Sequence, residues 1–170
     1  KFVLAHADPN EKLARKLLSI LNKSPHLYQT ILKHFSKYRR FSKTVSKKFL
    51  SQLQTEQLYE EITAAYLSTS LNKVHKDVKG DFKSYCVKLH NKRKIITSPN
   101  LRSIVFVWLL NENHFKFKEI ENIYKSNEWW LIHNSLEFID IDQFGKPSYQ
   151  AILNVLLKSV SFEVAIKAAY

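Results

Sequence analysis

The sequence predicts an all-α fold, and three features of the chain point to it. Only 2 glycines and 4 prolines occur in 170 residues, whereas sandwiches and barrels need many tight turns rich in these residues. Apolar residues recur three and four positions apart, the spacing that buries one face of an α-helix. Hydrophobic residues make up 45% of the chain, enough for a packed core. We therefore expect residues 1–170 to form one α-helical domain.

Four helix starts are expected in the first third of the chain, each where a capping residue precedes an apolar stripe. These residues are Asp8, Ser24, Ser42 and Thr55. A proline follows both Asp8 and Ser24 and suits the first helical turn. The helix beginning at Thr55 is expected to turn Tyr59 towards the core.

The next stretch is polar and then strongly basic. Residues 72–80 end in Gly80, so we expect a loop there, with Asp81 capping the following helix. Residues 91–97 contain Lys92, Arg93 and Lys94 and then the triplet Ile-Ile-Thr, which fits either a loop or a short strand.

The stretch from Lys88 to Leu110 is central to the prediction, because a basic segment there meets the most apolar one. Ser98-Pro99 separates the two and is expected to start a buried helix that carries Leu101 and Trp108 inward.

Further helices are expected from about Lys116 with Phe117 inward, and at Ser126, Pro147 and Ser161. Trp129 and Trp130 are adjacent and cannot both face the core, so one of them should lie at a groove or an interface.

About ten short helices at even spacing give a pair every 34 residues or so, close to the period of helix-pair repeats. The segments SPHLYQTILKHF and SPNLRSIVFVWL, which begin at Ser24 and Ser98, also place apolar residues at matching offsets. The expected architecture is therefore a stack of helix pairs, a HEAT-like α-solenoid. The alternative is a compact, irregular helical domain.

The formal net charge is +12, and it is unevenly distributed. Residues 1–102 have a balance of +14, whereas residues 103–170 have a balance of −2. Such a field is typical of proteins with a polyanionic partner. The alternatives are a solubilising surface and a face that docks onto an acidic part of a larger protein. We expect the chain to be a piece of such a protein, because it contains no methionine.

The expected partner is nucleic acid, with single-stranded RNA or DNA favoured over a duplex. Clustered cations would neutralise phosphates without reading sequence. The candidate phosphate-binding residues are Arg39, Arg40, Lys43, Lys47, Lys92, Arg93 and Lys94. The rings of Tyr38, Phe41 and Tyr85 stand next to cations and fit either base stacking or core packing.

No motif in the chain indicates catalysis, a metal or a cofactor. The two glycines are too far apart for a phosphate-binding loop, and no arginine has a histidine four to six residues downstream, as a helical ribonuclease would require. Cys86 and His90 can meet on one helix, but a nucleophile also needs an orienting group. Asp140 and Asp142 are more typical of a solvated loop than of a metal site.

The expected environment is the cytoplasm, away from membranes. A single cysteine cannot form an internal disulfide, and no apolar run approaches the roughly 18 residues of a membrane span.

The second half resembles the helical-repeat region that follows the polymerase in abortive-infection reverse transcriptases of bacteria. The resemblance lies in Arg102 before the Trp108-Leu109-Leu110 helix, in NEWWLIHNSL, in FGKPSY and in the closing FEVAIKAAY. It implies a phage-defence protein whose helical array shapes a channel for growing nucleic acid. The polymerase signature of that family, an aromatic residue followed by paired aspartates, is absent, so no catalytic role carries over. The sequence thus predicts a non-catalytic accessory domain that binds nucleic acid or, alternatively, a scaffold that docks through its basic face, with Trp129 or Trp130 as anchor.

Overall fold

A computed structural model describes residues 11–54, 59–126, 128–136 and 145–157 of the chain. Within these ranges there are nine α-helices, one short 3-10 helix and no strand, which confirms the all-α prediction. The helices are α2 (Glu11–Lys23), the 3-10 helix η1 (Pro25–Leu27), α3 (Tyr28–Phe35), α4 (Lys43–Leu53), α5 (Glu60–Ser70), α6 (Lys76–Asn91), α7 (Pro99–Asn111), α8 (Phe117–Lys125), α9 (Trp129–Ser135) and α10 (Pro147–Leu157).

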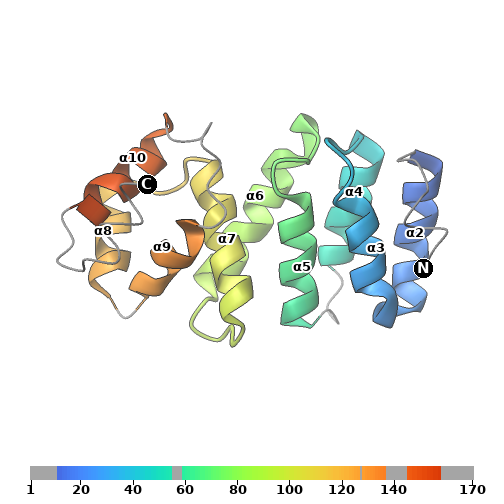
Figure 1. Cartoon of the computed structure of the whole chain (residues 1–170), viewed down its shortest axis with the longest axis horizontal. Coiled ribbons are helices and arrows are strands. Elements are labelled where there is room, and N and C mark those ends of the chain that lie inside the picture. Colours follow the sequence, from blue (N-terminus) through green and yellow to red (C-terminus); the bar gives the residue numbers. More distant parts are fainter. Residues whose placement is uncertain (1–10, 55–58, 127, 137–144, 158–170) are drawn as a thin grey trace.

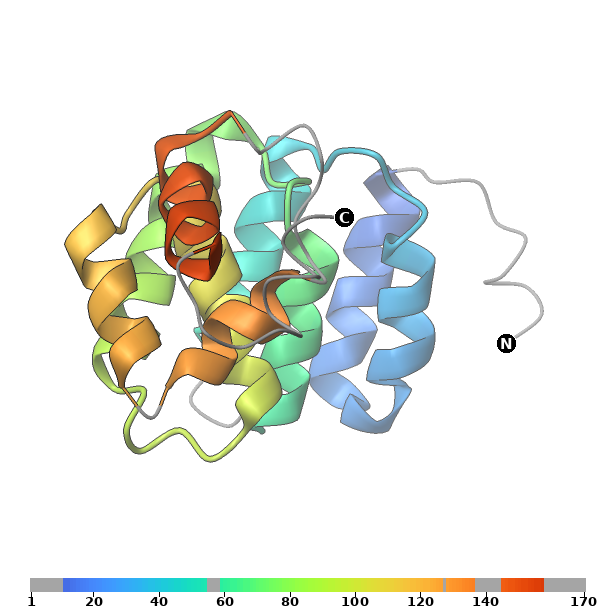
Figure 2. The same cartoon turned by 60° about the vertical axis from the view of Figure 1, so that its left-hand side comes forward.

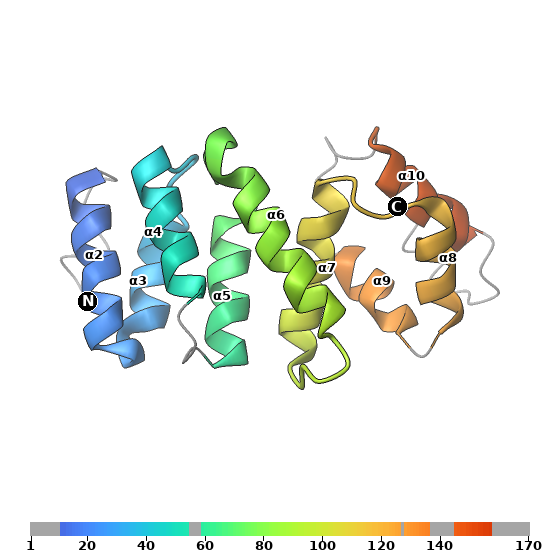
Figure 3. The same cartoon turned by 180° about the vertical axis from the view of Figure 1, so that it is seen from behind.

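The helices stand side by side in a row, and consecutive helices run in opposite directions (Figure 1). In one layer α3, α5, α7 and α9 pack against one another in order, and in the other α2 packs against α4 and α4 against α6. The view from behind brings this second layer forward (Figure 3). At the C-terminal end α10 packs on both α8 and α7 (Figure 2). The predicted stacking of helix pairs is therefore present.

Helix α7 forms the centre of the core, as the sequence predicted. Every residue from Ser103 to Asn111 is buried, because α5, α6, α9 and α10 all pack against this helix. The indole Nε1 of Trp108 donates to the carbonyl of Leu67 on α5 at 2.9 Å, and its ring stacks on Phe82 of α6 with centroids 5.3 Å apart. A second cluster of rings, contributed by α3, α4, α5 and the turn after α3, packs the N-terminal part of the row.

Two of the predicted helix starts are confirmed at the level of hydrogen bonds. The hydroxyl of Ser42 accepts from the amide of Val45 at 3.3 Å, and that of Ser98 accepts from Leu101 at 3.1 Å. At Ser24-Pro25 the chain first makes the 3-10 turn η1, and α3 begins only at Tyr28.

Two predictions are wrong, one about the start of α5 and one about the start of α6. Tyr59 is 78% exposed, because α5 begins only at Glu60. Residues 76–80, expected as loop, form the first turns of α6, and Asp81 lies inside this helix. Burial of Val78 and Phe82 outweighs the poor helix propensity of Gly80, and His75 takes the capping position by accepting from the amide of Asp77.

Other expectations have mixed outcomes. Residues 92–98 form a loop rather than a strand. Helix α8 occupies its predicted place, but Phe117 is 42% exposed instead of inward. Trp129 is the tryptophan that stays out of the core, at 49% exposure. The expected features at Asp8, Thr55, Asp140, Asp142 and Ser161 lie outside the described residues. None of the described helices is long and apolar enough to cross a membrane.

Candidate nucleic-acid interface

Three connections between helices lie along one long edge of the helical row, and the first two carry Arg39, Arg40 and Lys73 (Figure 1). Helices α3, α5 and α7 end there, and α4, α6 and α8 begin there (Figure 1). The turn after α3 is tied to the turn after α5, because Phe41 donates its amide to the carbonyl of Lys73 at 2.7 Å. The turn after α5 is tied to α7 by the side chains of Asn72 and Asn111, 3.3 Å apart. Segments far apart in sequence therefore share one surface.

We call this surface the basic end. Among its cations are Arg39, Arg40, Lys43, Lys47, Lys73, Lys76, Lys79 and Lys146. At its centre lies a groove of about 650 Å³, whose described lining includes five of these cations and no carboxylate. The floor is formed by the buried rings of Phe41 and Trp108. A concave surface with cationic walls concentrates the field on a bound anion.

Two lysines in the groove also stabilise the ends of helices. The Lys73 ammonium donates to the carbonyls of Phe35 and Ser36, at 3.4 and 2.8 Å, where α3 ends. The Lys146 ammonium donates to the carbonyl of Asn111 at 3.1 Å, where α7 ends. Unpaired carbonyls at a helix C-terminus favour such cations. These two lysines therefore have a structural role as well as a charge.

Like charges crowd the groove. Burial lowers the pKa of Lys146, the neighbouring ammonium of Lys79 lowers it further, and Glu112 acts in the opposite direction. Glu112 pairs with Lys79 at 2.7 Å. Burial also lowers the pKa of Lys73. An anion placed between these ammonium groups would relieve the repulsion that the carboxylate of Glu112 relieves only in part.

The exposed rim of the basic end carries Arg39, Lys43 and Lys47, and Arg40 of the groove lining is exposed as well. No carboxylate within the described residues pairs with the two arginines. Lys43 pairs with Asp77 at 2.9 Å, but both side chains are about half exposed, so the pair is readily exchanged for another anion. Hydrogen bonding to Lys43 is the main cause that lowers the pKa of Asp77.

The structure places the seven predicted phosphate-binding residues on two opposite long edges of the row. Arg39, Arg40, Lys43 and Lys47 lie at the basic end, whereas the three cations of residues 92–94 lie in the α6–α7 loop on the opposite edge (Figures 1 and 3). The side chain of Arg93 is moreover only 29% exposed, and it donates to Glu128 at 2.9 Å and to the carbonyl of His90 at 3.4 Å. The seven residues therefore do not form one surface.

Four cations of the groove were missed from the sequence: Lys73, Lys76, Lys79 and Lys146. A signal was present for the first three, which recur every three residues in KVHKDVK; Lys76 and Lys79 share one side of α6, and Lys73 lies in the turn before it. No local signal places Lys146 beside them, because this contact depends on how α10 packs on α7.

The aromatic rings next to the cations pack in the core. Phe41 is buried, and Tyr38 is half-buried against it with ring centroids 6.1 Å apart. The hydroxyl of Tyr85 donates to the carbonyl of Leu53 at 2.8 Å. In the described structure these rings pack and are not free to stack on bases.

The pair Cys86 and His90 does not form an activated nucleophile. Burial raises the pKa of the Cys86 thiol well above its usual range, which keeps it protonated. The His90 ring packs against Phe115 with centroids 5.2 Å apart, and burial, together with the nearby Arg93, lowers its pKa to about 4. No three histidine, cysteine or acidic side chains in the described ranges come together to hold a metal ion.

Comparisons with protein-family models, with curated proteins and with solved structures found no match for this chain. A functional proposal for the chain therefore depends on the geometry and charge of the basic end.

Proposed function

We propose that this chain is a non-catalytic helical array that binds single-stranded nucleic acid through phosphate contacts at the basic end. The observation that supports the proposal is the groove lined by Arg40, Lys73, Lys76, Lys79 and Lys146, with Arg39, Lys43 and Lys47 on its rim. Cations without a matching set of carboxylates favour a polyanion, and phosphates at regular spacing can use several of them at once.

A single strand suits this surface better than a duplex. The cations line a groove rather than a protruding helix, and a flexible backbone can follow such a groove. Because the nearby rings are occupied in packing, binding would depend on phosphates and show little sequence preference. In keeping with the resemblance of the second half to the helical-repeat region of abortive-infection reverse transcriptases, we propose that the array belongs to a larger polymerase-like defence protein and guides its nucleic acid.

A matched pair of double variants tests the proposal. Arg40→Gln with Lys76→Gln removes two exposed cations from the basic end, and Lys92→Gln with Lys94→Gln removes two exposed cations from the opposite edge of the row. Fluorescence anisotropy with labelled oligo(U) and oligo(dT) at low salt should show about a three-fold or larger loss of affinity for the first variant only. Equal losses, or no binding by the unaltered chain, would contradict the proposal.

A protein-interaction scaffold is the second candidate, and exposed Trp129 favours it. Its indole is 49% exposed on α9 and is a suitable anchor for a partner. A pull-down before and after nuclease treatment separates the two candidates. A partner that survives nuclease and is lost with Trp129→Ala supports the scaffold.

A further inference from the structure

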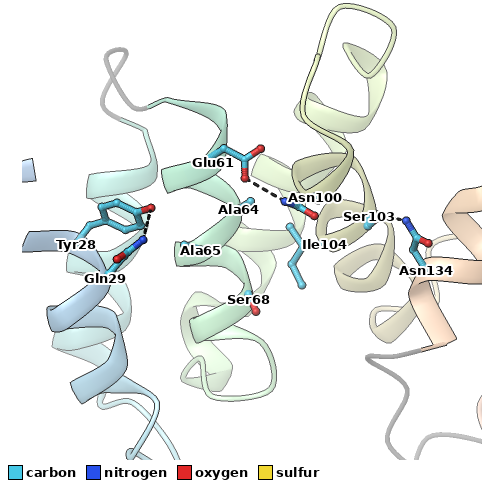
Figure 4. Close-up of a pocket in the computed structure, with 10 residues that line it drawn as sticks. All are labelled: Tyr28, Gln29, Glu61, Ala64, Ala65, Ser68, Asn100, Ser103, Ile104 and Asn134. Atoms are coloured by element: carbon cyan, nitrogen blue, oxygen red, sulfur yellow. Dashed lines mark hydrogen bonds between the residues drawn. The ribbon is translucent and has the colours of Figure 1, made fainter. Parts of the chain in front are cut away.

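A second hollow, independent of the basic end, lies across the layer formed by α3, α5, α7 and α9 (Figure 4). Its volume is about 500 Å³. Most of the floor consists of small side chains: α5 presents Ala64, Ala65 and Ser68 there, and α7 presents Ser103 beside the larger Ile104. A floor of this kind lets another backbone approach the helices closely.

Amide side chains from three helices form the walls. Gln29 of α3 and Asn100 of α7 are exposed, and Asn134 of α9 is half-buried. Asn100 donates through Nδ2 to Glu61 at 3.2 Å, and Asn134 donates through Nδ2 to Ser103 at 3.4 Å (Figure 4). In the described part of the chain these contacts leave the Oδ1 atoms of both asparagines to accept hydrogen bonds from a ligand.

The chemistry of this lining differs from that of the basic end. It includes no lysine or arginine, and Glu61 is its one charged residue among those described. A nucleic-acid backbone would find no cation here. A side-chain amide, by contrast, offers one donor group and one acceptor, as does each peptide unit of an extended chain.

The dimensions also suit an extended peptide. Neighbouring packed helices are about 8–10 Å apart, and the hollow crosses from α3 through α5 and α7 to α9. An extended chain rises about 3.3 Å per residue, so about seven to nine residues would cross it. We propose that this groove binds the main chain of an extended peptide that is neutral or basic, with the amides of Gln29, Asn100 and Asn134 holding its peptide groups and Glu61 favouring positive side chains.

The test uses an acetylated and amidated octapeptide of alternating alanine and lysine, added to the full chain labelled with nitrogen-15. Binding at millimolar concentration should shift the side-chain amide signals of Gln29, Asn100 and Asn134, which are directly visible in a two-dimensional NMR spectrum. The octapeptide with glutamate in place of lysine should bind about two- to five-fold more weakly, and Glu61→Gln should abolish that difference.

Two leucine variants provide the control. Ala65→Leu fills the floor of the groove and should abolish the shifts, whereas Asn122→Leu, exposed on α8 and not part of the lining, should leave them unchanged. Comparable melting temperatures would show that both variants fold. The proposal is overturned if the octapeptides cause no shifts, if Ala65→Leu binds as well as the unaltered chain, or if oligo(U) shifts the same signals and the octapeptides do not.

Discussion

The loop between α6 and α7 is held in large part by the carboxylate of Glu60, and removing this carboxylate should destabilise the protein measurably. Glu60, at the start of α5, accepts three hydrogen bonds through Oε2: from the amide of Thr97 at 2.9 Å, from its hydroxyl at 2.8 Å and from the amide of Ser98 at 2.6 Å. Partial burial acts in the opposite direction, but the hydrogen bonds from Ser98 and Thr97 lower the Glu60 pKa. The carboxylate thus helps to hold the start of α7 in place, together with Glu61, which accepts from the Ser98 hydroxyl at 2.6 Å.

The cost of Glu60→Ala depends on which donors lose their partner. Thr97 is exposed and can turn to water, whereas Ser98 is 6% exposed and its amide would stay without a partner. An unsatisfied buried donor costs about 1–3 kcal/mol, and the two lost bonds to Thr97 add roughly 1 kcal/mol more. We therefore expect the free energy of unfolding to fall by about 2–4 kcal/mol, a large fraction of the stability of a typical domain.

Urea denaturation followed by circular dichroism at pH 7 measures this loss. Asp81→Ala, which removes an exposed carboxylate inside α6, is the control and should change the free energy of unfolding by less than about 0.5 kcal/mol. Because the folded-state pKa of Glu60 is lowered, its contribution is present above the pKa of the unfolded chain and is lost as the pH falls through the folded-state value. A Glu60→Ala effect as small as that of Asp81→Ala would refute the reasoning.

Three other predictions concern buried groups. Burial and Arg93 lower the His90 pKa to about 4, so between about pH 6.5 and 4 the unfolded chain binds a proton that the folded chain does not. The free energy of unfolding should therefore fall as the pH drops through this range. In urea titrations at several pH values, His90→Phe should flatten this part of the profile. The buried Cys86 thiol should react with an aromatic disulfide reagent at pH 8 only after unfolding; rapid reaction of the native chain would contradict its burial. Trp108→Phe removes the bond to the Leu67 carbonyl and part of the core, and should cost about 1–3 kcal/mol in urea denaturation; an unchanged midpoint would show that this contact contributes little.

Features that depend on residues close in sequence were predicted correctly. The predictions were wrong where contacts between residues far apart in sequence determine the structure. Ser42 and Ser98 cap their helices as expected, because a cap needs only the next turn of the chain. Residues 76–80 were expected as loop because Gly80 disfavours a helix, but Val78 packs fully into the core and stabilises the helix. The resemblance to reverse-transcriptase accessory regions remains a prediction.

The candidate site shows the same limit. The charge runs were visible in the sequence, but their grouping depends on which long edge of the row each connection occupies. Lys92 and Lys94 are close in sequence to the central helix and yet lie at the opposite end of it from Arg40. Lys146 reaches the groove only because α10 packs against the end of α7, which no local pattern predicts.

The salt dependence of binding tests the central claim most directly. For single strands the slope of log affinity against log salt is about −0.7 for each phosphate contact. With about four to six contacts at the basic end we expect a slope of about −3 to −4 for oligo(U), reduced in magnitude by about 1.4 in the variant that lacks the cations of Arg40 and Lys76. The variant that lacks those of Lys92 and Lys94 should keep the full slope. A slope near zero, or the same reduction in both variants, would contradict phosphate binding at the basic end.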